Sequence, residues 1–197
     1  MFFLSAPPRA VVRDFIEQQS QSEFSYSEVG ATAGAMPKGY NLDHHRIQLG
    51  SGAASWNDAL NAFRRWQVFD IPWVRLYWPN LRMHVGVTVA LQVRHYGFYS
   101  LNACRIVYVI DEVEPLRRFG FAYGTLLDHA ESGEERFVVE WNRADDGVWY
   151  DITAFSRPRH ALAKLAYPVS RSLQKRFAAA SAAAMQRATF PRAEARG

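Results

Sequence analysis

Six β-rich runs follow one another between Trp73 and Ser156, and their close spacing restricts the possible folds more than any other feature. In order, the runs are WVRLYW, VGVTVALQVRHYG, FYSLNACRIVYVID, RFGFAYGTLL, EERFVVEWN and VWYDITAFS. Short turn-forming segments separate them. Parallel neighbours would need a connection of about a dozen residues or more. We therefore expect consecutive strands that pair antiparallel.

The chain that follows, from Pro158 onward, has the pattern of a long amphipathic helix. Its apolar stripe consists of Leu162, Leu165, Val169, Leu173 and Phe177. Basic residues lie mostly away from this stripe, at Arg159, Lys164, Arg171, Lys175 and Arg176. Pro168 should kink or interrupt the helix, because it removes a backbone donor and its ring clashes with the preceding turn. A curved sheet needs its apolar face covered, and this helix is the expected cover.

Shorter elements precede the strand region. Pro7 and Pro8 suit the first turn of a helix whose apolar positions are Val11, Val12, Phe15 and Ile16. Residues 30–39 predict an irregular loop, and HHRIQLG predicts a short strand. The segment SWNDALNAFRRWQVF predicts an amphipathic helix, with Ser55 as its N-cap and Asp58 completing a pattern like a capping box.

The length of 197 residues fits one core better than two. We expect an N-terminal helix and loop extension over residues 1–43, a single domain over residues 44–190 and a frayed tail over residues 191–197. The lone Cys104 permits no intrachain disulfide, so a reducing cytoplasm is the simplest location. The opening MFFL is too short for a signal peptide. No segment approaches the roughly 18 apolar residues of a membrane span, so no integral membrane association is expected.

This order of elements resembles the helix-grip fold of the START and Bet v 1-like superfamily. In that fold a short strand and small helices precede six strands, and a long helix closes the cavity. The resemblance implies an α+β chain, with a curved antiparallel sheet of about six to seven strands that grips a long C-terminal helix. A fold alone does not fix a function.

Three local motifs carry a closer resemblance: GYNLDHHRIQLGSG, GFYSLNACRIVYVIDE, and the pair GFAYGTLLDHAESGEERFVVEW and VWYDITAFSRPRHALAKLAYPVSRSLQKRF. Two parts of the last pair are the most specific. YGTLxxHxxxGEERF runs from Tyr123 to Phe137, and AFSRPRH runs from Ala154 to His160. They resemble a bacterial and plant family described as domain of unknown function nineteen-ninety, and the match covers roughly residues 24 to 187. The resemblance supports the single-domain boundary and the expected fold. It implies no reaction.

The segment FAYGTLLDHAESGEERFVVEW places one histidine, His129, among five acidic residues. We interpret it as two strands joined by DHAESG, which puts Asp128, His129 and Glu131 at a solvent-exposed tip. Glu135 differs, because it alternates in phase with Phe137, Val139 and Trp141 on the more apolar strand face. A carboxylate on that face needs a partner, and Tyr123 or Thr125 on the adjacent strand could supply one.

The remaining strands also present tyrosine and histidine at intervals on apolar faces, which suits either a solid core or a cavity for a small ligand. Our leading hypothesis is binding of a small apolar or amphipathic molecule between sheet and C-terminal helix. The expected polar contacts are His95, Tyr108, Tyr123, Thr125, Glu135 and Tyr150, because tyrosine and histidine combine an apolar body with a hydrogen-bonding tip.

Two hypotheses from other classes stay open. The same cavity could serve an enzyme, with Glu135 or His129 transferring a proton and Tyr123 steadying an oxyanion. Alternatively, the basic C-terminal helix could dock on a protein partner, as in a scaffold protein. The sequence does not fix the oligomeric state.

Other kinds of site are not favoured. The six histidines form no spaced pair typical of a zinc site, so we expect no metal. GATAG and GSGAAS lack the lysine and spacing of a nucleotide loop, and we expect no cofactor. The net charge of +4 is modest and no aromatic residues interleave with the basic stripe, so nucleic acid is not an expected partner. Cys104 reads as a buried structural thiol.

Overall fold

A curved antiparallel sheet dominates the computed structural model, which describes residues 1–78, 81–159 and 167–190. The strands lie in the order β2 (Asn41–Ser51), β8 (Gly147–Pro158), β7 (Glu131–Asn142), β6 (Arg117–Thr125), β5 (Tyr99–Glu112), β4 (Thr88–Arg94) and β3 (Val74–Tyr77). The expected run of consecutive antiparallel strands is confirmed as β3 to β8. Strand β2 extends the sheet beyond β8, and the short β1 (Phe2–Phe3), which was not expected, pairs with the start of β5.

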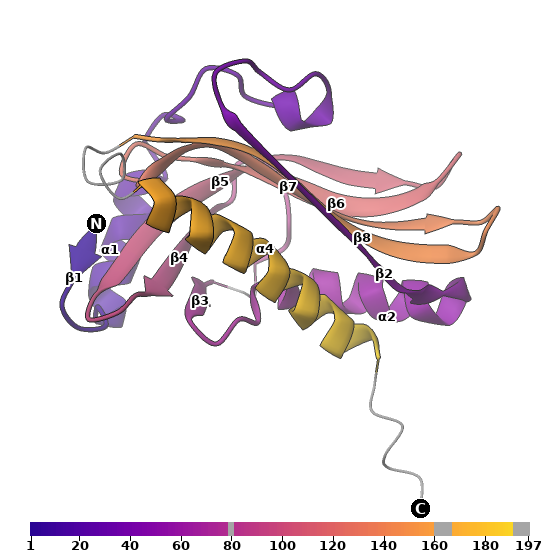
Figure 1. Ribbon diagram of the computed structural model, residues 1–197. Helices are drawn as coiled ribbons and strands as arrows, with labels where there is room; N and C mark the ends of the chain where they lie inside the picture. The colour runs from indigo at the N-terminus through magenta and orange to yellow at the C-terminus, as the bar shows by residue number, and fades with distance from the viewer. Residues whose placement is uncertain (79–80, 160–166, 191–197) are drawn as a thin grey trace, which may run out of the picture.

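One face of the sheet is covered by α2 (Gly52–Arg64), the 3-10 turn η2 (Gln67–Phe69) and α4 (Tyr167–Thr189). Helix α4 runs diagonally across this concave face, beside α2 (Figure 1). The largest fully buried side chains between these helices and the sheet are Trp56 and Phe63 of α2 and Phe121, Phe137 and Tyr150 of the strands. Burial of each contributes roughly 2–3 kcal/mol to stability. The chain is therefore an α+β protein in which a curved sheet grips the C-terminal helix, which is the helix-grip architecture.

The opposite face carries the N-terminal segment. Helix α1 (Arg9–Gln19) packs Val12, Phe15 and Ile16 against a second core on β4 and β5, made by Ala90, Leu101 and Ala103. The chain then continues over the same outer face, through the 3-10 turn η1 (Ala31–Ala33), on the side of the sheet away from α4 (Figure 1). Both faces of the sheet are therefore covered in part, which leaves few strand residues exposed on either side.

The start of α2 differs from the expectation. Its N-cap is Ser51, which makes no side-chain capping bond, and Ser55 lies inside the helix. Gly50 and Gly52 have φ values of +145° and +78°, a backbone that turns β2 directly into the helix without a polar cap. The expected cap at Ser55 is therefore wrong, because the chain enters the helix through Gly50 and Gly52 instead of through a side-chain cap.

The C-terminal helix also begins later than expected. Pro158 is the last residue of β8, where it pairs with Glu131 of β7, so the strand displaces the expected helix start. Pro168 lies in the first turn of α4 as described, a position that tolerates proline. The expected stripe residues Leu162 and Leu165 and the expected frayed tail lie outside the described residues. Among the residues described, no helix is long and apolar enough to cross a membrane.

Candidate ligand-binding site

A cavity of about 540 Å³ lies between the concave face of the sheet and α4. Its size is within the range of pockets that hold small organic ligands. Much of the wall is apolar, because side chains two residues apart on each strand face the same side. These apolar wall residues are Trp73, Val74, Leu91, Val93, Ile152, Ala154, Leu173, Phe177 and Ala178. The expected stripe of α4 thus supplies Leu173 and Phe177 to the cavity.

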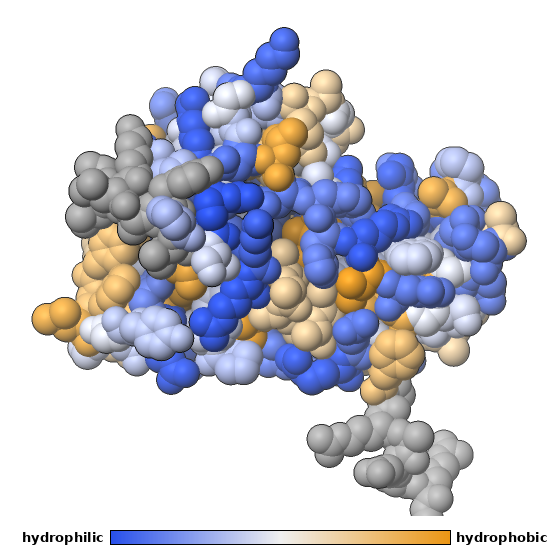
Figure 2. Space-filling model, in the orientation of Figure 1, coloured by the Kyte–Doolittle hydropathy of each residue, from blue (hydrophilic) through white to orange (hydrophobic). Residues whose placement is uncertain are grey.

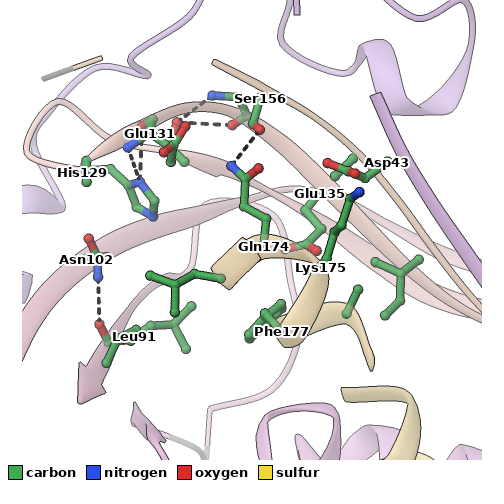
Figure 3. A pocket seen from close by; sticks show the side chains of 18 of the residues that line it. Asp43, Leu91, Asn102, His129, Glu131, Glu135, Ser156, Gln174, Lys175 and Phe177 are labelled. Carbon is green, nitrogen blue, oxygen red and sulfur yellow. Dashed lines mark hydrogen bonds between the residues drawn. The ribbon is translucent and has the colours of Figure 1, made fainter. Parts of the chain in front are cut away.

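Tyr123 and Glu135 form the central polar pair of the cavity. They are directly opposite each other on β6 and β7, and the Tyr123 hydroxyl donates a hydrogen bond of 2.8 Å to Oε2 of Glu135. Figure 3 shows the Glu135 side chain reaching from the sheet toward α4, where Phe177 lies. The alternation of residues that placed Glu135 on the apolar face of its strand therefore correctly predicted where the Glu135 side chain points.

The environment changes the acidity of both groups. Burial raises the pKa of Glu135 to about 7, the nearby Asp43 carboxylate adds to the rise, and the Tyr123 hydrogen bond opposes it. Burial raises the pKa of Tyr123 well above its usual value, with a contribution from Glu135. Tyr123 consequently stays protonated and donates, whereas Glu135 exchanges between acid and carboxylate near neutral pH. This carboxyl group can act as a charged contact or transfer a proton.

His95 and Thr125 also line the cavity, and both make contacts within the protein. His95 Nε2 lies 2.8 Å from the Ser100 hydroxyl, and burial lowers the pKa of His95. The Thr125 hydroxyl accepts a bond of 2.9 Å from the Gly133 amide and lies 2.6 Å from the Ser25 hydroxyl. Both residues shape the wall, and the Nε2 atom of His95 and the hydroxyl of Thr125 are already engaged within the protein.

Tyr108 and Tyr150 lie outside the cavity wall, contrary to expectation. A β-bulge between Ile106 and Tyr108 shifts the phase of β5, so Tyr108 turns to the outer face and pairs with the Thr32 hydroxyl at 2.7 Å. Tyr150 does face the concave side, but it is fully buried in the core, where its hydroxyl lies 2.8 Å from that of Ser181.

The connection between β6 and β7 is shorter than expected, because β7 already begins at Glu131. As a result His129 and Glu131 line the rim of the cavity rather than a solvent-exposed tip. The Glu131 amide donates to Nδ1 of His129 at 3.0 Å (Figure 3). Asp128 is exposed and accepts a 2.9 Å bond from Gln19 of α1. Within the described chain, no group of three His, Cys, Asp or Glu residues could hold a metal ion.

Several polar residues of the site were missed from the sequence. Gln174 of α4 donates to the Ser156 hydroxyl at 2.9 Å (Figure 3), and Arg171 binds both oxygens of Asp43 at 2.6 and 2.7 Å. These contacts tie the helix to β8 and β2 at the edge of the cavity. Asn102 also lines the cavity. The sequence could have indicated this, because Asn102 lies two residues before Cys104 and therefore shares its strand face. No sequence signal marks the contacts of Gln174 and Arg171, because they depend on how α4 crosses the sheet.

The exterior around α4 is mixed in polarity. Figure 2 shows hydrophilic atoms over much of this face, with apolar atoms visible between them. Arg176 is exposed and lies over the ring of Trp73, 5.0 Å from its centroid, at the edge of the cavity. The basic side chains of α4 therefore border the site instead of forming a separate stripe.

Known proteins resemble the chain over nearly its whole length. A UPF0548 protein from Dictyostelium discoideum is 35% identical over 195 residues, covering 90% of each chain. Another from Deinococcus radiodurans is 36% identical over 196 residues, covering 90% of this chain and 93% of the relative. In structure, a hypothetical protein from Helicobacter pylori aligns with a TM-score of 0.52 at 8% identity, covering 86% of this chain and 98% of that one, which is a likeness of fold alone.

The sequence model of one family matches most of the described fold. Its match spans residues 25–184, from the loop after α1 into α4. The two most specific parts of the motifs noted in the sequence, at Tyr123–Phe137 and at Ala154–His160, fall inside the match. By this match and by its relatives, the chain belongs to the family described as domain of unknown function DUF1990.

Proposed function

We propose that this protein binds a small, largely apolar molecule between its sheet and α4, with the polar end of that molecule at Tyr123 and Glu135. The observation that carries the proposal is a cavity of about 540 Å³ whose mostly apolar wall includes the partly buried carboxyl group of Glu135, paired with Tyr123. An apolar wall supplies affinity and a few placed polar groups supply orientation. A core that only had to be stable would not retain a carboxyl group whose pKa is about 7.

The contacts of the proposed site follow from the wall. Glu135 and Tyr123 orient the polar end, while Leu91, Ile152 and Phe177 contact the apolar part. His95 and Thr125 contribute mainly shape, since the Nε2 atom of His95 and the Thr125 hydroxyl already have protein partners. A cytoplasmic location is part of this proposal and is supported by the buried, unpaired thiol of Cys104.

An enzymatic role is the second candidate, and one observation favours it. A carboxyl group with a pKa near 7 is matched to general acid–base catalysis at neutral pH. The Tyr123 hydroxyl, however, points at Glu135 and would have to leave it to contact an oxyanion. We therefore place ligand binding first. Docking through the basic helix is not proposed, because Arg171 is engaged with Asp43.

A pair of substitutions on α4 tests the binding proposal. Ala178 lines the cavity, whereas the next residue, Ala179, is exposed. In Ala178→Phe the added ring enters the cavity, and in Ala179→Phe it enters solvent. We expect the neutral fluorescent probe N-phenyl-1-naphthylamine to bind the wild type and Ala179→Phe equally, and Ala178→Phe at least about tenfold more weakly.

Two readouts complete this test. Circular dichroism should show that all three proteins are folded, and mass spectrometry of an organic extract should identify any co-purified apolar molecule. Undiminished probe binding by a folded Ala178→Phe protein would overturn the proposal. Turnover of such a molecule by the wild type, lost in Glu135→Gln, would instead favour the enzyme.

A further inference from the structure

We propose that the cavity selects a ligand whose polar end is a protonated amine over one that ends in a carboxylate. This inference rests on the proposed function and adds the chemical class of the ligand. Its starting point is the direction of one hydrogen bond: Tyr123 donates to Oε2 of Glu135, and Oε1 makes no hydrogen bond within the described chain. The carboxyl group therefore offers an acceptor to the cavity.

The charges around Glu135 leave a place for a cation. No lysine or arginine of the described residues forms an ion pair with Glu135. Asp43 on β2 is a second carboxylate at the wall, and both its oxygens are bound by Arg171. A buried carboxylate without a cation is costly, and a ligand ammonium group would compensate it. A ligand carboxylate would meet like charge instead.

Several other ionisable groups lie near Glu135 or line the cavity, and one of them, Lys175, is basic. Tyr123 on β6, Cys104 on β5 and Tyr150 on β8 all have pKa values raised by burial, so they are neutral at pH 7. Lys175 on α4 lines the cavity near Asp43 (Figure 3), but it is exposed to solvent, which screens its charge, and the described residues show no ion pair between it and Glu135. The cavity histidines are His44, His45, His95 and His129. The pKa of His95 is lowered by burial, which keeps that ring neutral.

Aromatic rings add to the preference for a cation. Tyr123, Trp73 and Phe177 all line the cavity, and the centroids of Trp73 and Phe177 are 6.4 Å apart. Ring faces attract an ammonium group and repel a carboxylate. Arg176 already lies 5.0 Å from the centroid of Trp73, so the cavity rings left for a ligand cation are those of Tyr123 and Phe177. Carboxylate and rings therefore favour the same kind of polar end.

Three unbranched probes of ten carbon atoms each test the inference: decylamine, 1-decanol and decanoate. We expect decylamine to bind the wild type at least about tenfold more tightly than decanol at pH 7, and decanoate to bind most weakly, as measured by titration calorimetry. Glu135 has a pKa of about 7 and is therefore about half protonated at pH 7. Binding of the amine should release about half a proton, seen as a dependence of the heat on the ionisation enthalpy of the buffer.

Matched variants distinguish the preference for an amine from ligand binding itself. Glu135→Gln should lose at least about tenfold in affinity for decylamine and lose the proton release, while its affinity for decanol stays within about twofold. Glu17→Gln removes the same charge from an exposed position on α1 and should behave as the wild type. If decanol or decanoate binds as tightly as decylamine, or if Glu135→Gln keeps its amine affinity, the inference is overturned while ligand binding stands. If none of the three probes binds, both fail.

Discussion

Glu134 and Glu135 are consecutive in the sequence and lie on opposite faces of β7. Glu134 is 2% exposed and accepts bonds from the Tyr26 hydroxyl, the Gly30 amide, and the amide and hydroxyl of Thr32. Glu135 faces the cavity and accepts from Tyr123. Because side chains alternate along a strand, one step in sequence separates a carboxylate that fastens the N-terminal loop from one that can meet a ligand.

Replacement of Glu134 by glutamine should therefore destabilise the fold while the hydrogen bond between Tyr123 and Glu135 stays in place. The amide nitrogen of glutamine cannot accept a hydrogen bond, so at least one buried donor of the N-terminal loop loses its partner. We expect a loss of about 2 kcal/mol in the free energy of unfolding, measured with urea. Trypsin should also cleave faster after Lys38, which is exposed just beyond this loop. Glu17→Gln is the control, and equal cleavage of the two variants would contradict the role given to Glu134.

Replacement of Glu135 by glutamine should have the opposite effect on stability at neutral pH. The pKa of Glu135 is about 7 in the folded protein and 4.5 as its ordinary value. Between these values the folded state binds more protons than the unfolded state, so this group lowers stability as pH rises from 4.5 to 7. Above pH 7 the loss is complete. Glutamine stays neutral and accepts the Tyr123 bond at every pH.

We accordingly expect Glu135→Gln to exceed the wild type in stability by on the order of 2 kcal/mol at pH 8, or roughly 4–8 °C in melting temperature. At pH 4.5 the two proteins should melt nearly together. Thermal unfolding across this pH range is the measurement. A constant difference at all pH values would show that the carboxyl group is not titrating as described, and a less stable variant at pH 8 would refute the raised pKa.

Strand phase explains both what the sequence predicted about the site and what it did not. The alternation of Glu135 with Phe137 and Val139 indicated its direction, and short turns fixed the antiparallel order from β3 to β8. Tyr108 was misplaced because one extra residue in β5 shifts the phase, and nothing in its local sequence marks that bulge. The pairing of β2 with β8 joins distant parts of the chain and could not be read from local pattern.

Contacts between distant segments account for the remaining gaps. The N-terminal loop closes over Glu134 from about a hundred residues away in sequence, so Glu134 looked like one more charge in a hairpin. Arg171 was expected away from the apolar stripe of the C-terminal helix, and nothing in the sequence singled out Gln174. Helical periodicity gives the face of α4 but not its crossing angle over the sheet, and that angle decides which polar residues reach the cavity edge.

Replacement of Tyr123 and of Tyr150 by phenylalanine should distinguish the role of a cavity residue from that of a residue in the core beneath it. Each change removes one buried hydroxyl contact and should cost about 1 kcal/mol in stability. Tyr123→Phe also removes the bond that lowers the pKa of Glu135, so that pKa should rise further above 7. Tyr150→Phe loses only its contact with Ser181 and should leave that pKa and probe binding unchanged. Carboxyl carbon NMR shifts of Glu135 against pH provide the test, and identical titrations in the two variants would contradict it.

The last prediction concerns the link between Arg171 on α4 and Asp43 on β2, in which two nitrogens of the guanidinium bind the two carboxylate oxygens at 2.6 and 2.7 Å. Arg171→Lys keeps the charge but cannot reproduce the paired geometry. Because both side chains are partly exposed, we expect a loss of only about 1 kcal/mol in stability.

The larger effect of Arg171→Lys should be faster hydrogen exchange in the first half of α4 and faster release of a bound probe, since this contact holds the helix at the cavity edge. Arg187→Lys, near the other end of α4, is the control. Asp43→Asn breaks the same link and also removes a negative charge near Glu135, so it alone should lower the pKa of Glu135. Probe release from Arg171→Lys at the rate of the control would show that α4 is held by its apolar contacts alone.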